Sequence, residues 1–330
     1  MSNTQTTTNL SSKNQENIFS RINFGNYTIY ILILGLFLFL GLTSKTFFSY
    51  RNIYTIFYSV SIEFFAIIGF TYLIIMGEVD LSVGSIYCFS GVMVGYLVTM
   101  ERMPLVTAVL IALLCSALLG MLTGVIITKL KVNSIMVTLG TMMLIRGLAW
   151  IITGEMAGRT FSRSLRSLAR EKIGTINVTV IILIVLVIVL EITLRRTSFF
   201  KKVFYVGENL ESAKIYGINS DRIKIYLFTL SAFTAAIGGI FVASRIGHGD
   251  VTTGKGLEFK VLTAAVLGGA SLFGGKGSIF KSMIGLVFLA TLLNGMIIYK
   301  IEPLLQQLAV GIILIISVFI DTRLNRKQAS

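Results

Sequence analysis

The amino-acid sequence predicts an all-α, polytopic membrane protein with about ten transmembrane helices. Of its 330 residues, 55% are hydrophobic and only 13% are charged, whereas an ordinary soluble domain is about a quarter charged. Apolar stretches long enough to cross about 30 Å of hydrocarbon as a helix recur between short polar joints, and the chain contains only two prolines. Helices and short loops therefore use nearly all of the length, which leaves no room for a soluble catalytic domain.

Ten spans can be placed in order along the chain. The stretch 55–99 is too long for one crossing, so the letters MGEVDLS at 76–82 must form a turn or a break. The span at 258–273 is short and glycine-rich. We therefore expect broken or re-entrant segments near 77–84 and near 258–278. The expected spans cover about 27–44, 55–76, 81–99, 104–128, 135–153, 176–194, 224–243, 258–273, 279–299 and 303–321.

The two ends of the chain and one internal segment are hydrophilic. Residues 1–26 form a polar tail of low complexity, which we expect to be disordered. This tail precedes the first apolar run, so a cleavable signal peptide is not expected. The transmembrane domain then covers 27–321, and 322–330 form a basic tail. Within the domain, the segment 195–224 is too long for a minimal turn, and we expect short helices outside the membrane there.

Basic residues in the loops indicate the orientation. An inside N-terminus places slightly more lysine and arginine in the cytoplasm than outside, with both tails and 195–224 cytoplasmic. The margin is small because the external loop 154–175 is itself basic. Its arginines lie at helical steps, opposite three apolar side chains, so we expect a short amphipathic helix on the membrane surface. Its basic face would comprise Arg159, Arg163, Arg166 and Arg170.

The sequence lacks the residue patterns of enzymes and metal sites. Its only histidine, His248, is expected in an external loop, which excludes histidine relays and multi-histidine metal sites. The letters GGASLFGGKGS do not match a phosphate-binding loop. Cys88 and Cys115 fall inside spans and are interpreted as small apolar side chains. The net charge of +14 is interleaved with spans, which favours lipid headgroups and acidic protein partners over nucleic acid.

Four acidic residues within or near the spans are candidates for coupling to protons or sodium ions. Glu191 is expected near a span end, and Asp80 is expected to cap the helix that follows it. Glu63 is the acid that we expect to be buried, with Arg146 as a candidate partner. We favour pairing and capping for these side chains. Ion coupling remains the alternative, and its candidates are Glu63, Glu78 and Asp80.

Three segments resemble those of one family. GEVDLSVGS at 77–85, VGENLESAKIYGI at 206–218 and GKGLEFKVLTAAVLGGASLFGGKGSI at 254–279 are similar to motifs of ribose-type ABC importer permeases. This branch serves ribose, arabinose, galactose and autoinducer-2. The segments occur in the family's order, and the resemblance covers about 27–321. The chain departs from the family's pattern at Glu78, Glu208 and Lys260, which leaves phosphorylated or nucleoside-like cargo as an alternative to a sugar.

The resemblance implies a subunit of the bacterial inner membrane that imports a small, pentose-like sugar. Its implied partners are a second permease, in a homo- or heterodimer, an ABC ATPase and an extracellular sugar-binding protein. ATP and magnesium would be bound by the ATPase, and the permease would bind no cofactor and perform no covalent chemistry. The alternative function is an ion-coupled secondary sugar transporter.

The resemblance also implies roles for particular residues. The 206–218 loop would dock into the ATPase, with Ala213 permitting close approach and Gly217 ending its helix in a left-handed cap. The glycines at 268–277 would serve helix packing, the translocation path or both. The loop 154–175 would face the binding protein, with lipid headgroups as the alternative. The residues implied in coupling are Gly207, Asn209, Glu211, Ala213, Lys214 and Gly217, and those in the path are Asp80, Ser82, Gly268, Gly269, Ser271, Gly274 and Gly275.

Overall fold

The computed structural model describes residues 24–155 and 160–329, and these fold almost entirely into helices. The ten apolar helices are α2 (Phe24–Thr43), α3 (Tyr50–Ile75), α4 (Val83–Thr99), α5 (Leu105–Leu130), α6 (Ser134–Glu155), α8 (Val178–Arg196), α11 (Ser220–Ile246), α12 (Leu257–Leu267), α13 (Ile279–Ile298) and α14 (Pro303–Ala329). Three short helices lie between them, α7 (Arg163–Ser167), α9 (Ser198–Glu208) and α10 (Leu210–Ile215). A small antiparallel hairpin joins β1 (Lys172–Ile173) to β2 (Ile176–Asn177).

The prediction of an all-α membrane fold is confirmed, and each of the ten expected spans corresponds to one helix. Seven helices, α3, α5, α6, α8, α11, α13 and α14, are long and apolar enough to cross a bilayer. The shorter helices α2 and α4 are also apolar. Helix α12 differs from the expected span, because it ends at Leu267 and is too short to cross a bilayer by itself.

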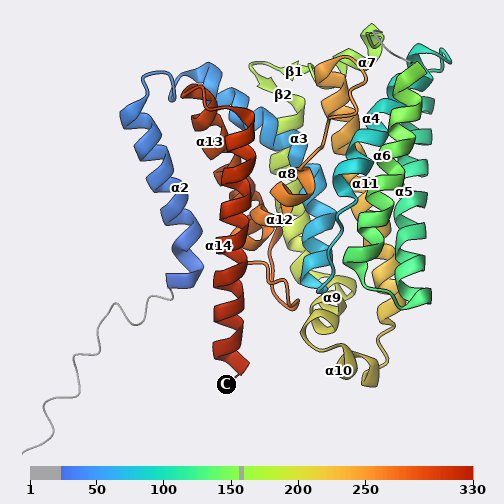
Figure 1. The fold of residues 1–330 in the computed structure, drawn as a ribbon, viewed down its shortest axis with the longest axis vertical. Helices are drawn as coiled ribbons and strands as arrows, with labels where there is room; N and C mark the ends of the chain where they lie inside the picture. The colour runs from blue at the N-terminus through green and yellow to red at the C-terminus, as the bar shows by residue number, and fades with distance from the viewer. Residues whose placement is uncertain (1–23, 156–159, 330) are drawn as a thin grey trace, which may run out of the picture.

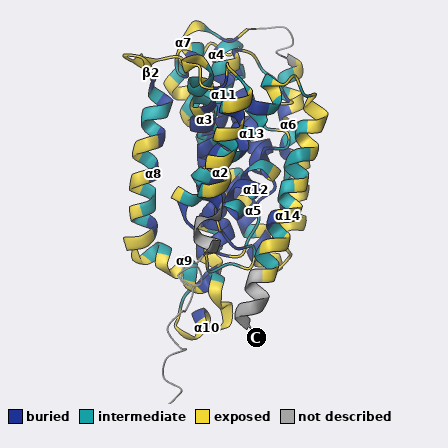
Figure 2. Ribbon diagram, turned by 90° about the vertical axis from the view of Figure 1, so that its left-hand side faces the viewer, coloured by how far each residue is buried: buried dark blue, intermediate teal, exposed yellow. Residues whose placement is uncertain are grey.

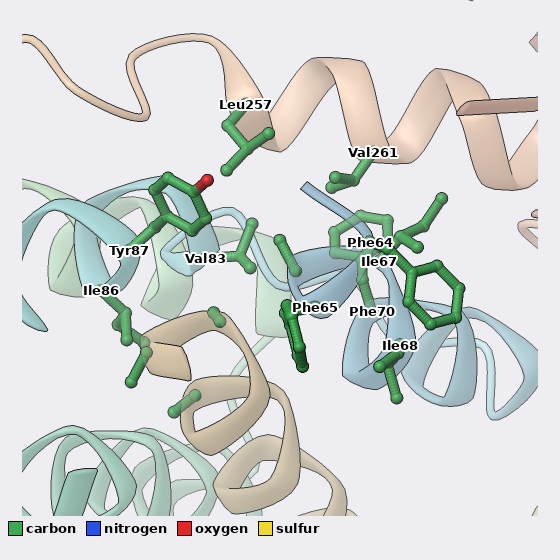
Figure 3. Close-up of a cluster of buried hydrophobic side chains, with 14 of the residues drawn as sticks. Phe64, Phe65, Ile67, Ile68, Phe70, Val83, Ile86, Tyr87, Leu257 and Val261 are labelled. Atoms are coloured by element: carbon green, nitrogen blue, oxygen red, sulfur yellow. The ribbon is translucent and has the colours of Figure 1, made fainter. Parts of the chain in front are cut away.

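The helices form a buried centre and an exposed periphery (Figure 2). Of the most apolar window of α3, 83% is buried, against 11% in α14 and 22% in α5 and α8. The peripheral helices expose large aliphatic side chains, which a bilayer covers as readily as a protein core does. At the centre, apolar side chains from α3, α4 and α12 come together, including Phe64, Val83 and Val261 (Figure 3).

Small residues allow the central helices to approach closely. A Cβ atom at Gly239 of α11 would overlap the carbonyl oxygen of Tyr87 in α4. On the other side of α11, a Cβ atom at Gly69 of α3 would overlap the backbone of Ser231. Helix α11 therefore lies between α3 and α4 at backbone contact, as expected where membrane helices associate through small residues.

Two crossings of the bundle are interrupted by non-helical chain. The expected break near 77–84 is confirmed, because residues 76–82 separate α3 from α4 and Gly77 has φ +82°. A second interruption, 247–256, joins the end of α11 to α12, which begins near mid-height of the bundle (Figure 1). The second interruption contacts the first turn of α4, since a Cβ atom at Gly84 would overlap the carbonyl oxygen of Gly254. The non-helical segment 247–256 and α12 together make one crossing rather than a re-entrant loop.

The basic segment after α6 differs from the expected surface helix. Its helix, α7, has only five residues, and its apolar side chains Phe161 and Leu165 are buried within the protein. The ring of Phe161 occupies the space beside Gly95 of α4, and its backbone N–H donates to the carbonyl oxygen of Gly247 at 2.8 Å. The expectation that this apolar face lies on lipid is therefore wrong, because the end of the bundle covers it.

Candidate functional site

The described part of the chain contains a cavity of about 920 Å³, a volume typical of sites for small molecules. Its walls come from α3, α4, α11, α12, α13, α14 and the segment before α12. Each long helix in these walls contributes lining residues from the half that is nearer α7. Glu63 lies at the middle of α3, and Ile246 lies at the end of α11 beside α7. The cavity therefore lies in the half of the bundle that ends at α7.

An ion pair lies in the cavity wall. Lys260 Nζ lies 2.8 Å from Oε1 and 2.7 Å from Oε2 of Glu63, and both side chains are largely buried. The sequence interpretation that gave Glu63 the partner Arg146 is wrong. Arg146 instead donates hydrogen bonds of 2.8 Å to the carbonyl oxygens of Val251 and Thr253. The segment between α11 and α12 is not helical, so its carbonyl groups lack partners within a helix. Arg146 therefore supplies hydrogen bonds to two of these carbonyl groups.

Asp80 and Ser82 lie in the interior and not in the cavity wall. Each is 1% exposed. Asp80 Oδ1 accepts hydrogen bonds from the backbone N–H and the hydroxyl group of Ser82, at 2.9 and 2.6 Å. Its other oxygen accepts from the hydroxyl group of Ser231 in α11 at 2.9 Å. The expected capping role is met in part, because Asp80 binds Ser82, the residue that precedes α4. Asp80 also joins the non-helical segment 76–82 to α11.

The remaining acidic candidates also have partners. Glu78 forms an ion pair with Lys224 in the first turn of α11. Glu191 lies near the end of α8, as expected, 2.7 Å from Arg195 Nε. It also accepts hydrogen bonds of 3.1 Å from the hydroxyl group of Ser278 and the backbone N–H of Phe280, at the start of α13. A carboxylate is stabilised there by the positive end of the helix dipole.

Two of the glycines that the resemblance assigns to the translocation path, Gly274 and Gly275, lie at a contact with α9. A Cβ atom at Gly207 of α9 would overlap the carbonyl oxygen of Ile75 at the end of α3. Gly275 donates its N–H to the same oxygen at 2.8 Å, and a Cβ atom at Gly274 would meet the backbone of Gly207. We call the contact of Gly207, Ile75, Gly274 and Gly275 the glycine junction. It brings together α3, α9 and the turn that follows α12.

The other expected path residues also serve turns and packing in this structure. A Cβ atom at Gly268 would overlap the backbone of Lys281 in α13, and Gly269 has φ +84°, in the left-handed region that glycine adopts freely. The hydroxyl group of Ser271 donates to Asp321 Oδ2 of α14 at 3.2 Å. The turn between α12 and α13 is therefore fastened to both of its neighbours, α13 and α14.

The segment 195–224 forms the helices α9 and α10 at the other end of the bundle from α7 (Figures 1 and 2). The ring of Phe200 in α9 stacks on Tyr72 of α3 at a centroid distance of 4.4 Å. The side chain of Asn209 caps α10 by accepting from the N–H of Ser212 at 2.9 Å. Gly217 follows the helix with φ +74°, so the expected left-handed turn is present.

Helix α10 presents two side chains that the sequence interpretation did not single out. Ile215 and Tyr216 are each 84% exposed, whereas Ala213 is buried inside the chain and Glu211 and Lys214 are exposed. The signal available in the sequence was an apolar pair, IY, inside an otherwise polar segment. Two adjacent and highly exposed apolar side chains form a candidate surface for contact with another protein.

The basic residues near α7 are only partly gathered on one surface. Arg163 and Arg170 are exposed, whereas Arg166 is partly buried beside Gly247. Arg159 lies outside the described residues. The segment is fastened to the bundle, since the N–H of Ala169 donates to the hydroxyl group of Ser244 at 2.9 Å.

Comparisons with known proteins place the chain among transport permeases. Residues 52–318 match the family described as the branched-chain amino acid transport system permease component. The ribose import permease protein RbsC of Haemophilus influenzae is 30% identical over 305 residues, which cover 91% of this chain and 94% of that protein. The autoinducer 2 import system permease protein LsrC is 32% identical over 298 residues, which cover 90% of this chain, both in Yersinia pseudotuberculosis (85% of that protein) and in Yersinia enterocolitica (82%). No solved structure matches.

The family's description names amino acids and the relatives' names refer to ribose and autoinducer 2, so family membership leaves the solute open. What these comparisons share is the role of the polypeptide, a multi-pass permease that works with a separate ATPase. The polytopic helical fold agrees with that role. The chain belongs to the family of branched-chain amino acid transport system permease components, and it is the membrane permease of an ABC importer rather than its ATPase.

Proposed function

We propose that this permease imports a small sugar, pentose-like or of the autoinducer-2 type, with energy from ATP hydrolysed on another polypeptide. The names of its relatives support this solute class. The cavity of about 920 Å³ has room for a small sugar and its water. No cofactor is assigned to this chain, and ATP and magnesium belong to the partner ATPase.

The proposed orientation has α9, α10 and both termini in the cytoplasm. The support is the basic charge at that end of the bundle, which the positive-inside rule assigns to the cytoplasm. Arg195, Arg196, Lys201, Lys202 and Lys214 all lie in or beside α9 and α10. In this orientation α7 and the cavity face outward, where a binding protein delivers the solute.

The observation that carries the proposal is the glycine junction. A helix pair that an ATPase moves must transmit its displacement to the membrane helices, and Gly207 lies in backbone contact with the end of α3. The same junction includes Gly274 and Gly275, in the turn directly after α12. Lys260, in the cavity wall, lies in the first turn of α12, about 10 Å along that helix from its other end at Leu267. Displacement of α9 thus reaches the cavity through α12.

We propose separate contact surfaces for the ATPase and the binding protein. Ile215 and Tyr216 of α10 would enter an apolar groove of the ATPase. Arg163, Arg166 and Arg170 would meet acidic side chains of the binding protein and mainly raise the rate of encounter. Anionic lipid headgroups are the alternative partner for these arginines. A second permease would complete the membrane part of the importer, as a homodimer or a heterodimer.

Ion coupling is the less favoured function because its candidate carboxylates are engaged. Glu63 pairs with Lys260, Glu78 pairs with Lys224, and Asp80 accepts hydrogen bonds from Ser82 and Ser231. A carboxylate that binds a transported proton or sodium ion must be available to it.

The test is purification of the tagged chain from its native membrane, followed by reconstitution into proteoliposomes. We expect an ABC ATPase to co-purify, and a second, different permease to appear if the importer is a heterodimer. Uptake of labelled D-ribose or autoinducer 2 should require ATP and the binding protein. Recovery of the chain alone, with uptake driven by a proton or sodium gradient, would reject the proposal in favour of secondary transport.

A further inference from the structure

We propose that the cavity is a selective solute site within this chain, built to take a neutral polyhydroxylated solute and to reject its phosphorylated analogue. The Glu63–Lys260 pair would bind the hydroxyl groups. That a solute enters this cavity rests on the proposed function. The new element is the chemistry by which the permease itself distinguishes one solute from another. This chemistry favours a sugar over phosphorylated cargo, two alternatives that the sequence left open.

The ion pair can bind hydroxyl groups without being broken. Lys260 Nζ contacts both carboxylate oxygens of Glu63, at 2.8 and 2.7 Å. An ammonium group has three N–H donors and a carboxylate has about four acceptor positions, so each group keeps capacity after pairing. A sugar hydroxyl both donates and accepts, and it can therefore bind to the two partners together. The side chains retain 15% and 23% exposure, so they remain within reach of the cavity.

The charges around the cavity disfavour an anion. Its lining contains three carboxylates, on Glu63, Asp250 and Glu258, and two amines, on Lys255 and Lys260. A phosphate oxygen that accepted a remaining N–H of Lys260 would lie beside the Glu63 carboxylate, because the pair is in contact. Like charges brought together in a partly desolvated site repel each other by several kcal/mol. A neutral hydroxyl group meets no such repulsion.

Apolar surface completes the chemistry of a sugar site. Phe259 is 45% exposed and lines the cavity beside Lys260, together with Leu293 and Val242. The C–H faces of a sugar ring need such apolar and aromatic surface, while its hydroxyl groups need the polar pair. Gln307, on the opposite helix α14, adds an exposed amide to the lining.

The test measures binding of labelled D-ribose and D-ribose 5-phosphate to the full chain in lipid nanodiscs. The wild type should bind D-ribose saturably in the millimolar range, as suits a site that must release its solute, and should bind the phosphate at least about tenfold more weakly. Glu63→Gln leaves the ammonium unpaired, and the preference should shift toward the phosphate by at least about tenfold. Lys260→Gln should weaken binding of both solutes.

The double variant, Glu63→Gln with Lys260→Gln, distinguishes an effect of charge on solute preference from a general disruption of the cavity. It restores a neutral wall, so the preference should return to D-ribose, at lower affinity. Glu101→Gln, in the exposed turn between α4 and α5, is the matched control and should behave as the wild type. Each variant must be monodisperse by size-exclusion chromatography.

The inference is overturned if the wild type shows no saturable binding of D-ribose, binds both solutes equally, or keeps its preference in Glu63→Gln. These outcomes differ from failure of the proposed function, which would appear as absence of a co-purifying ATPase. The binding experiment uses the chain alone. Failure of solute selectivity and failure of ATPase association can therefore each be observed without the other.

Discussion

At the scale of single residues, charged side chains in the membrane-spanning part are joined to segments far away in the sequence. Glu63 of α3 pairs with Lys260 of α12, and Arg146 of α6 binds the carbonyl oxygens of 251 and 253. Both contacts hold the same broken crossing, which consists of segment 247–256 and α12. An unsatisfied charge or carbonyl group within a bilayer is unfavourable by several kcal/mol, so the ion pair holds α12 against α3 and Arg146 holds the non-helical segment 247–256 against α6.

The glycine junction supports a prediction at this scale. Gly207→Ala should separate α9 from Ile75, because the added Cβ atom overlaps that carbonyl oxygen, at a cost of about 1–3 kcal/mol by analogy with overpacked cores. We expect ATP hydrolysis stimulated by the loaded binding protein to fall by at least about tenfold, with membrane insertion retained. The assay is the ATPase rate of the reconstituted importer.

Gly140→Ala provides the control for this experiment. Gly140 lies in α6 with open space where a Cβ atom would be placed, so the substitution should leave the ATPase rate unchanged. Full stimulation in Gly207→Ala would contradict a role for the junction in coupling.

At the scale of elements, the short helices link distant parts of the molecule. Helix α12 has its first turn in the cavity wall and continues into the turn that contacts α9. Helices α9 and α10 are held to the bundle by Val203, Val206 and the stacked ring of Phe200, yet α10 leaves Ile215 and Tyr216 exposed. Buried apolar contacts fix the inner side of the pair, and its outer side remains free for a partner.

This arrangement leads to a prediction about α10. Replacing Ile215 and Tyr216 together by serine should weaken association with the ATPase by about tenfold or more, because exposed apolar anchors supply much of the affinity of an interface. Both side chains are 84% exposed, so the stability of the permease should be nearly unchanged. Co-purification yield and thermal unfolding of the permease give the two readouts.

The matched control is Tyr50→Ser in α3, an exposed tyrosine at the end of the bundle near the β1–β2 hairpin. It should leave the recovery of the ATPase unaffected. Undiminished recovery of the ATPase with the double variant would show that α10 is not its contact surface.

At the scale of the whole molecule, the fold separates a central layer from a peripheral one. Helices α3, α4 and α11 form the centre, and α5, α6, α8 and α14 expose aliphatic side chains (Figure 2). The two ends of the bundle also differ, since the cavity lies toward α7 and the glycine junction lies at the end with α9.

The proposed orientation can be tested with single cysteines in intact cells. Arg163→Cys, near α7, should react with a membrane-impermeant maleimide, whereas Lys201→Cys, in α9, should react only after the cells are opened. Both positions are exposed, so accessibility should depend on the side of the membrane. Labelling of the wild type gives the background from Cys88, which is buried, and Cys115, which is partly buried. The opposite labelling pattern would reverse the assignment of the two ends.

The sequence by itself determined the helical membrane fold, the order of ten apolar helices and the break before α4. Hydrophobic length and glycine placement are local properties, and a bilayer converts them directly into helices and interruptions. The left-handed turn at Gly217 and the position of Glu191 near the end of α8 were predictable for the same reason, because each depends on a few neighbouring residues.

Only the tertiary structure decided which distant residues meet. It paired Glu63 with Lys260 instead of Arg146, buried the apolar side of α7 against the bundle, and placed the expected path glycines at a contact with α9. It also placed Asp80 and Ser82 in the interior, away from the cavity wall. These outcomes depend on how α11 lies between α3 and α4 and on where the segment 247–256 returns into the bundle. Such contacts join segments separated by many residues, and the periodicity of one segment carries no information about its neighbour in space.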